Sequence, residues 1–567
     1  MRAASLSALL AGCSTDQDGA QATSEGFGDF CANALAAVEA HLGSQLPQAP
    51  GPEYGGTGVV GAIGEMVDGM NALVSGEYAA NQHQRFVNLM TLVRPDEALR
   101  PTPYLARDWD FSPEGDELTF HLREDVLWHD GTPTTAHDVA FTFLRATDPA
   151  TGFPNSGYWA HYVPGSEGVE VLDDFTVRFR LTPHAEPLDP WGSMAILPSH
   201  LLGDVSPERL REHPFGNVCP VGNGPFRFVE HRTNDRWVFQ ANPHFPEALG
   251  GRPRLDRLVY RVIPEMTTLL TDLLTGGVDV YVGVGPDQLG TIRGSQDARV
   301  VTFPFRTYLF VGWNTRDPRL ADARVRRAMT LAADREGMVE ALLGGYGQVA
   351  NAGVPPFHWA YNPAMEEALP HDPEEARRLL DEAGWVDRDG DGIRENADGL
   401  RLSFVVEYNQ GEQVRESVAG VLQDQLRPVG IELLPRVVEW AALVGRITSP
   451  ERTGVEGFVL GWVPDLRVDD RDLFHSEREA EAFGFAGLQD PRVDALLDTL
   501  QLIPSREEAR PLWFQYQELL AELQPFTYLF FRDRLVGMHR RIRDVEMDVR
   551  GEWVGVTRWW IPTQERR

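Results

Sequence analysis

Short segments in which polar and apolar residues alternate mark the first part of the chain. The alternation is clearest over residues 118–122 and 176–181, and an apolar run covers residues 58–63. Because successive side chains of a strand point to opposite faces of a sheet, a period of two predicts half-buried strands. Regular structure is therefore expected to begin at about residue 58.

Helices are predicted further along the chain, over residues 322–343 and 373–383. Each of these segments opens near an aspartate, whose side chain can accept hydrogen bonds from free N–H groups of the first turn, and ends at a glycine. Strands and helices then interleave along the chain. This order predicts an α/β protein.

Residues 14–56 have the composition of a linker, rich in Ala, Gly, Gln and Pro. The alanine-rich stretch from Cys31 to Leu42 can form a helical turn or two, but no core position is predicted in it. Low hydrophobicity of this kind is typical of segments that bury little surface. We therefore predict a flexible tether over residues 13–57.

The first residues resemble a bacterial lipoprotein signal. Arg2 precedes an apolar stretch that ends in Leu10-Ala11-Gly12-Cys13, and a polar run follows. In such signals small residues admit the peptidase and the cysteine thiol carries the lipid. Residues 1–12 are thus predicted to be a signal peptide and Cys13 to be lipidated. The alternative is an ordinary start that happens to contain these letters.

Two further cysteines, Cys31 and Cys219, lie far apart in the sequence. An exported compartment would permit them to form a disulfide. Two unpaired thiols are equally compatible with the sequence.

Charge and length narrow the class of protein. The chain has 567 residues, of which 52 are basic and 84 acidic, for a net charge of -32, and none is lysine. This field opposes binding to nucleic acid, and the missing lysine excludes a P-loop. No window contains the roughly 18 apolar residues that a membrane-spanning helix needs. The length is sufficient for two lobes.

A series of short motifs has the order and spacing of a known family. They lie at residues 103–109 (PYLARDW), 118–123, 128–133 (WHDGTP), 222–226 (GNGPF), 325–335, 375–385 and 461–465 (GWVPD). Each motif alone is an ordinary turn or helix signal. Together, over about residues 58–560, they make the chain resemble the family 5 extracellular solute-binding proteins, which include dipeptide and oligopeptide receptors.

The resemblance implies a two-lobed periplasmic-binding-protein-like fold of type II, with an extra subdomain and a cleft between the lobes. The expected boundaries are 58–303 for lobe I with the inserted subdomain, 304–529 for lobe II and 530–567 for the return to lobe I. In this fold the lobes close around a ligand about a hinge.

The resemblance also indicates candidate ligand-binding residues. Asp465 has the setting in which peptide-binding members hold the ligand's α-ammonium with a carboxylate, although the loop that follows departs from their pattern. The alternative is a solvated loop aspartate. Trp462, Tyr308, Trp313 and Asn314 can wall a pocket with aromatic faces and one amide, but aromatic residues at strand ends are more often part of a core.

An acidic run in residues 387–392 alternates Asp387, Asp389 and Asp391. Such carboxylates can chelate calcium, which takes several hard oxygen ligands. However, the spacing departs from that of an EF-hand, and a turn between a helix and a strand is the favoured interpretation. We predict no resident metal or cofactor.

The predicted function is that of a substrate-binding lipoprotein of an ABC importer, in the periplasm or on the outer face of the cytoplasmic membrane. It would capture short peptides as a monomer and deliver them to the permease and ATPase subunits, without enzymatic activity. Alternatives are a non-peptide solute such as an oligosaccharide or a nickel chelate, and a ligand-presenting signalling receptor. An exported hydrolase is less favoured, because HExxH, CxxC and GxSxG motifs are absent from the sequence.

Overall fold

The computed structural model describes residues 29–47 and 51–566, with gaps at 68, 75–76, 154–155, 157–158, 160–162, 164–165, 183–185, 450–453, 465–467, 482 and 504. Cys13 and Asp465 lie outside the described residues. Contacts divide the chain into two compact units, unit 1 with Met1–Pro183, Leu188–Phe303 and Leu535–Arg567, and unit 2 with His184–Pro187 and Pro304–Arg534. Among the described helices, none combines the length and apolar character needed to cross a membrane.

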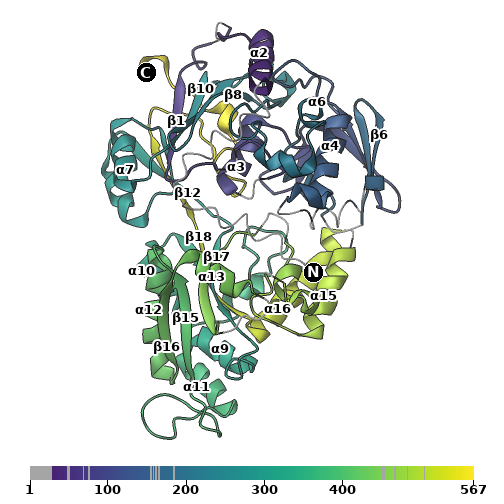
Figure 1. Ribbon diagram of the computed structural model, residues 1–567. Coiled ribbons are helices and arrows are strands. Elements are labelled where there is room, and N and C mark those ends of the chain that lie inside the picture. The colour runs from purple at the N-terminus through teal and green to yellow at the C-terminus, as the bar shows by residue number, and fades with distance from the viewer. Residues whose placement is uncertain are drawn as a thin grey trace. The chain divides into compact units, whose positions relative to one another are not determined.

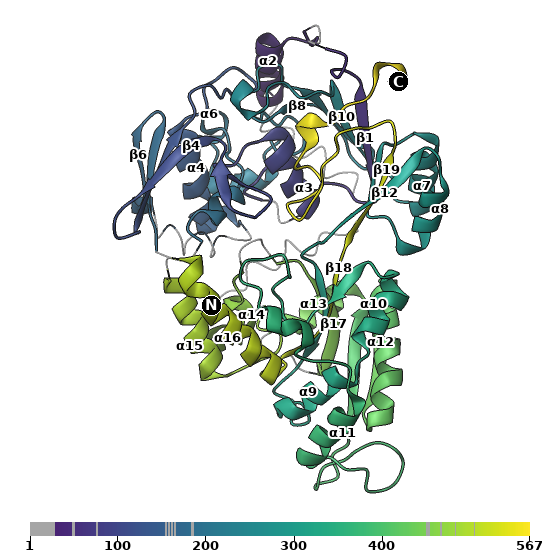
Figure 2. The same ribbon diagram turned by 180° about the vertical axis from the view of Figure 1, so that it is seen from behind.

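The largest sheet of unit 1 is mixed and has seven strands (Figure 1). Its strands, in spatial order, are β12 (Ala298–Phe303), β19 (Arg534–His539), β11 (Val280–Val282), β1 (Thr57–Ala62), β10 (Arg257–Val262), β9 (Arg236–Ala241) and β8 (Phe226–Arg232). β1 pairs in parallel with both of its neighbours. The helices α7 (Met266–Thr275) and α8 (Leu289–Gly294) lie beside the end of the sheet that carries β12 and β19 (Figure 2).

A four-stranded antiparallel sheet completes the main framework of unit 1. It contains β4 (Ala106–Phe111), β5 (Glu117–Leu122), β7 (Thr176–Arg180) and β6 (Val169–Asp173). β5 and β7 confirm the strands predicted from alternation. Against this sheet the ring of Trp191 packs 4.2 Å from that of Phe179 and 4.6 Å from that of Phe143, which lies on α4 (Ala136–Thr147).

The helix α2 (Phe30–Leu42) belongs to the core of unit 1. Ala34, Val38 and Leu42 are buried, and their spacing of four residues places them on one face of the helix. Cys31, in the first turn, forms a disulfide with Cys219. The prediction of a flexible tether without core residues is therefore wrong for this segment, because one apolar face and one cross-link are enough to dock a short helix.

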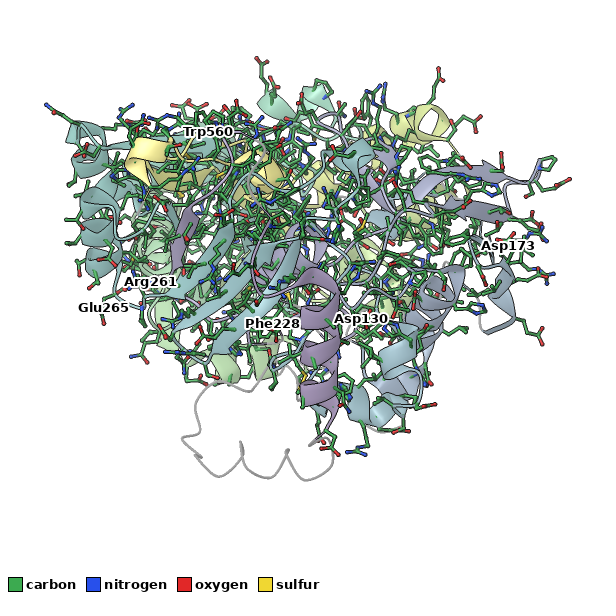
Figure 3. All side chains as sticks on the ribbon, turned by 90° about the horizontal axis from the view of Figure 1, so that it is seen from above. Asp130, Asp173, Phe228, Arg261, Glu265 and Trp560 are labelled. Carbon is green, nitrogen blue, oxygen red and sulfur yellow. A yellow bond between two sulfur atoms is a disulfide. The ribbon has the colours of Figure 1, made fainter. Side chains whose placement is uncertain are left out.

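The last turn of α2 packs on the turn at Asp130 and Gly131 (Figure 3). Gly131 has a φ of +91°, and a Cβ atom there would lie 2.9 Å from Nδ1 of His41. Glycine is required at this position for both reasons. On the other side of the turn, Nε2 of His200 donates to Asp130 at 2.8 Å.

The disulfide should contribute strongly to the stability of unit 1. Replacing Cys31 and Cys219 together by serine removes a cross-link over a sequence separation of 188 residues. The free energy of unfolding is expected to fall by about 2–5 kcal/mol. Thermal unfolding of the two proteins under oxidising conditions measures the difference. Equal melting temperatures, or free thiols detected by alkylation of the denatured wild type, would contradict the pairing.

Unit 2 is built on a six-stranded mixed sheet. Its strands, in spatial order, are β14 (Gly347–Val349), β18 (Phe526–Arg532), β13 (Tyr308–Trp313), β17 (Gly457–Trp462), β15 (Ser403–Asn409) and β16 (Glu432–Val438). β13 is buried along its whole length. Leu309 and Val311 belong to one hydrophobic cluster, and Phe310 to another. The sheet thus separates two cores.

Helices cover both faces of this sheet. The first cluster contains residues of α9 (Ala323–Ala332), α10 (Arg335–Leu343), α11 (Pro373–Glu382) and α12 (Gln413–Leu426). The second contains residues of α13 (Trp440–Ile447), α14 (Arg471–Phe474), α15 (Pro491–Leu502) and α16 (Arg506–Leu523). In both ribbon views α15 and α16 lie side by side (Figures 1 and 2). A helix-covered sheet of this kind confirms the α/β class.

The helix predicted over residues 322–343 is in fact two helices. Ala333 has an extended backbone, and the Asp334 side chain accepts a hydrogen bond from the N–H of Gly337 at 2.8 Å, which starts α10. Aspartate is a strong N-cap, and here it interrupts one helix to open the next. The prediction of a helix over 373–383 is confirmed by α11.

Candidate functional site

One end of the unit 2 sheet brings several functional candidates together. β13 begins where β17 and β18 end, so that Tyr308 lies opposite Trp462 on one side and Phe531 on the other. Trp313 and Asn314 lie at the far end of β13, roughly 17 Å away at about 3.3 Å per residue. The structure therefore unites Tyr308 with Trp462 and separates both from Trp313 and Asn314.

Trp462 carries an aromatic surface at this end of the sheet. Its ring is half-buried and lies 5.4 Å from the ring of Phe483, which is 38% exposed. The following residue, Val463, is 47% exposed. Aromatic and apolar groups left in contact with water at one place are typical of ligand sites. Asp465 comes two residues later, outside the described residues, and its ligand contact stays a prediction.

Two arginines border the same end of the sheet, and the sequence analysis did not find them. Arg532 is the last residue of β18, and Arg415 lies in the first turn of α12. An Nη atom of Arg415 would lie 3.4 Å from a Cβ atom placed on Gly461, next to Trp462. We call Trp462, Phe483, Arg415 and Arg532 the strand-end site.

The two guanidinium groups have few partners within the described chain. Nη1 of Arg415 donates to Oδ1 of Asn409 at 2.5 Å, but its buried Nε has no acceptor within the described chain. For Arg532 no side-chain hydrogen bond or ion pair is found among the described residues. Desolvation lowers the pKa of both groups, the nearby Glu412 raises both, and the charge of Arg532 lowers the pKa of Arg415 further. The strand-end site can therefore stabilise a bound anion.

Tyr308, opposite Trp462 in the sheet, belongs to a buried cluster of tyrosines around Asp470. It is 1% exposed, and its ring is 5.3 Å from that of Tyr528. The hydroxyl of Tyr516 donates to Asp470 at 3.0 Å. Desolvation raises the pKa of Asp470 to about 7, the bond from Tyr516 lowers it, and the charge of Asp469 raises it. Tyr308 is thus packed in the core beside Tyr528, and its contact with a ligand stays a prediction.

Trp313 and Asn314 make contacts within the protein. Nε1 of Trp313 donates to the hydroxyl of Thr527 at 2.9 Å, and the Trp313 ring is buried. Nδ2 of Asn314 donates to the carbonyl of Val455 at 2.9 Å. The first bond joins β13 to β18, and the second joins the residue after β13 to the segment that precedes β17. Ligand contacts by the two residues remain predictions.

The acidic run follows α11 and precedes β15, as the prediction of a turn required. One carboxylate oxygen each from Asp387, Asp389 and Glu395 lie within 4.8 Å of one another. Asp391 instead forms an ion pair with Arg401 at 2.6 Å. In the structure Glu395 therefore takes the place of Asp391 in the set of carboxylates that the sequence suggested.

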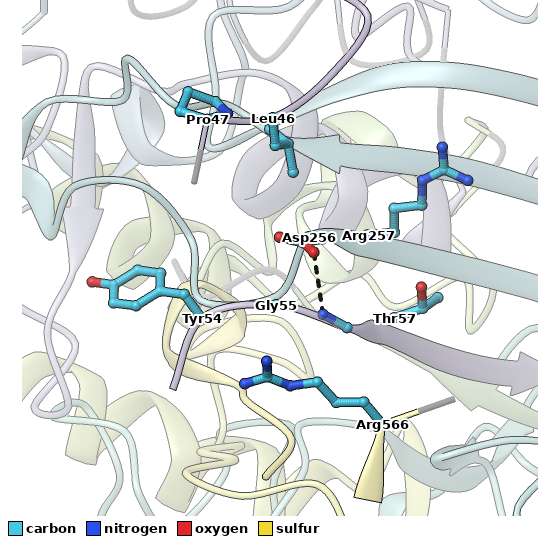
Figure 4. Close-up of a pocket in the computed structure, with 9 residues that line it drawn as sticks. Leu46, Pro47, Tyr54, Gly55, Thr57, Asp256, Arg257 and Arg566 are labelled. Carbon is cyan, nitrogen blue, oxygen red and sulfur yellow. Dashed lines mark hydrogen bonds between the residues drawn. The ribbon is translucent and has the colours of Figure 1, made fainter. Parts of the chain in front are cut away.

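Unit 1 contains a surface pocket of about 610 Å³ (Figure 4). It is lined by Leu46, Pro47, Tyr54, Gly55, Gly56, Thr57, Asp256, Arg257 and Arg566. Asp256 accepts a hydrogen bond from the N–H of Gly56 at 3.3 Å, and Nε of Arg566 donates to the carbonyl of Ile561 at 2.9 Å. Because the protein itself uses these polar groups, this pocket is a weaker candidate than the strand-end site.

Comparison with known proteins identifies the family. The model of bacterial extracellular solute-binding proteins, family 5 Middle, matches residues 100–479, more than half of the chain. The chain belongs to this family. The resemblance seen in the motifs of the sequence is thereby confirmed.

One relative of this family 5 protein matches most of its length. The oligopeptide-binding protein AppA of Bacillus subtilis is 31% identical over 517 residues, which cover 90% of this chain and 92% of AppA. The structure of AppA in complex with a nonapeptide has a TM-score of 0.74, with 90% of this chain and 100% of the AppA chain covered. The two-lobed fold expected from the resemblance is confirmed by this likeness.

Other relatives have different names and ligands. The structure of NikZ from Campylobacter jejuni in complex with Ni(L-His) has a TM-score of 0.75 at 26% identity, covering 89% of this chain and 99% of NikZ. Heme-binding protein A of Haemophilus influenzae is 26% identical over 474 residues, 79% of this chain and 82% of the relative. Membership of the family alone therefore does not specify the solute.

The family 5 protein should lose stability as Asp470 ionises. Its pKa of about 7 in the folded state exceeds the ordinary value of 3.8. Between about pH 4 and 7 the folded state keeps a proton that the unfolded chain releases, so stability falls as pH rises, by about 1.4 kcal/mol for each pH unit. Asp470→Asn, which still accepts from Tyr516, should abolish this fall.

Urea unfolding of wild type and Asp470→Asn between pH 4.5 and about 7.5 measures the effect. The stability of the variant relative to the wild type should increase steadily with pH. A difference that is constant across this range would mean that Asp470 has an ordinary pKa.

Proposed function

We propose that this protein is the substrate-binding component of an ABC importer, that it captures short peptides and that it delivers them to a permease. AppA, 31% identical over 90% of the chain, is named as an oligopeptide-binding protein. Its solved complex contains a nonapeptide. These likenesses support peptides as the first class of solute to test.

The charges of the strand-end site suit one end of a peptide. Arg532, half-buried and without an acceptor among the described residues, is the observation that carries the proposal. A guanidinium group binds a carboxylate through two parallel hydrogen bonds, and partial burial strengthens the attraction. Arg532 and Arg415 would hold the ligand's carboxylate, and the rings of Trp462 and Phe483 would contact its side chains.

The opposite end of a peptide is an ammonium group. Asp465 is the proposed partner of this group, on the resemblance of its Trp-x-x-Asp setting to that of peptide-binding members. Trp313 and Asn314 would act indirectly, because the Trp313 bond ties β13 to β18 and the Asn314 bond ties the end of β13 to the segment before β17. Ligand binding by this arrangement makes and breaks no covalent bond.

A chelated metal is the second candidate ligand. NikZ, with a TM-score of 0.75, was solved with Ni(L-His). The amino acid in such a chelate also carries a carboxylate, which the two arginines of the strand-end site can bind. Oligosaccharides, and a signalling role without transport, lack support of this kind.

A thermal-shift screen with peptide, sugar and metal-chelate libraries tests the class of solute. A ligand that binds only the folded state must raise the melting temperature. Peptides with free termini are expected to give the largest shifts. If peptides have no effect and another class stabilises the protein, the peptide proposal fails.

Arg532→Gln should weaken binding of peptides with a free carboxylate about 10- to 100-fold, because a charge-assisted hydrogen bond contributes about 1.5–3 kcal/mol. Binding of the same peptides with an amidated C-terminus should change little. Calorimetric titration of both peptide forms measures the difference. Arg510→Gln, on an exposed position of α16, is the matched control. An unchanged preference for the free carboxylate would remove Arg532 from the site.

We also propose that the protein is a monomer, anchored by lipid on Cys13 to the outer face of the cytoplasmic membrane or retained in the periplasm. When both proteins are expressed in a bacterium and partitioned with Triton X-114, the wild type should enter the detergent phase. The Cys13→Ser variant should enter the aqueous phase. Thr15→Ala, next to the same segment, should stay in the detergent phase. Aqueous partitioning of the wild type would contradict lipidation.

A further inference from the structure

The loop between α11 and β15 contains a buried carboxylate that the solute-binding function does not use. Glu395 is 7% exposed. Its backbone is held on both sides by isolated bridges to Val386 and to Arg401, so its side chain starts from a defined position. The other acidic residues of the loop are exposed.

One oxygen of this carboxylate has no protein partner. Oε1 of Glu395 accepts a hydrogen bond from the N–H of Arg388 at 2.7 Å. Oε2 is buried, and within the described chain it accepts no hydrogen bond. A buried carboxylate oxygen in this state is costly unless a donor or a cation satisfies it.

Two further carboxylates lie close enough to Glu395 for all three to bind one cation. One oxygen from each of Asp387, Asp389 and Glu395 lie within 4.8 Å of one another. Calcium binds oxygen at about 2.3–2.6 Å, so ligands on one ion lie up to roughly 5 Å apart. The N–H groups of Gly390 and Gly392 donate to Asp387 at 2.8 and 3.0 Å, which orients its carboxylate while leaving lone pairs free.

Arg401 pairs most closely with a different carboxylate. Arg401 lies 2.6 Å from Asp391 and 3.6 Å from Asp389. No ion pair of Glu395 or Asp387 is found among the described residues. Three carboxylates therefore share, at most, one long contact to a guanidinium group.

We propose that Asp387, Asp389 and Glu395 bind a calcium ion, with Glu395 as the buried ligand. The donors are all carboxylate oxygens, which favour hard cations over zinc and copper, for which imidazole and thiolate are better ligands. The exposed side of the loop leaves room for waters to complete the coordination. Calcium fits better than magnesium, because it tolerates irregular geometry and several protein ligands. Asp391, which the sequence grouped with the other two aspartates, stays paired with Arg401.

Binding of calcium chloride to the full-length protein, stripped with EDTA, tests the site by titration calorimetry and thermal unfolding. One ion per chain is expected, with a Kd of about 10⁻⁵ to 10⁻³ M. Saturating calcium should raise the melting temperature by a few degrees. Absence of both signals, or equal affinity for magnesium, would overturn the proposal.

Glu395→Gln keeps the size of the side chain and the acceptor for Arg388 but removes the charge. It should weaken calcium binding at least about 10-fold while leaving the protein in EDTA as stable as the wild type or more stable. Asp398→Asn is the matched control, an exposed residue of the same loop outside the three ligands, and should bind calcium normally. Equal loss in both variants would indicate diffuse attraction and overturn the assignment.

If Glu395→Gln fails to fold, Asp389→Asn replaces it, because Asp389 is exposed and its loss cannot disturb the core. This variant should also weaken calcium binding at least about 10-fold. Unchanged affinity would overturn the proposed ligand set. Neither substitution touches the strand-end site, so the outcome is independent of the proposed import function.

Discussion

Burial of β13 on both faces is the constraint that organises unit 2. Leu309 and Val311 pack into one core, and Phe310 packs into the other. Such a strand must pair its backbone with neighbours on both sides, and a shift of one residue would move every side chain into the wrong core. The register that places Tyr308 beside Trp462 is therefore set by packing. The position of the strand-end site follows from this register.

The strand-end site carries positive charge, whereas the protein as a whole is negatively charged. The chain has a net charge of -32, whereas Arg415 and Arg532 lie partly buried with Glu412 as the nearby acid. Charges separated by more than about 8 Å are largely screened at physiological ionic strength. Recognition of an anionic group would therefore depend on short contacts with these two arginines, while the acidic surface would slow the approach of anions.

Two buried carboxylates in unit 2 are accommodated in different ways. Asp470 lies among tyrosines and accepts a hydrogen bond from one of them, and desolvation raises its pKa. Glu395 is a buried residue of a loop whose other acidic residues are exposed, and it lies beside two other carboxylates. A hydroxyl group suits a carboxyl that can be protonated, whereas clustered carboxylates favour a cation. A buried carboxyl group is thus part of the core at Asp470 and part of a candidate metal site at Glu395.

By itself the sequence determined the α/β class, the strands β5 and β7, the helix α11 and the family, because each rests on a local pattern or on motifs in order. Only the tertiary structure decided the docking of α2 through Cys31 and Cys219, the meeting of Arg415 with the end of β18, and the place of Glu395 beside Asp387. Each of these joins side chains that no local period connects. Their proximity depends on how the chain folds back on itself, which hydrophobic burial sets for the molecule as a whole.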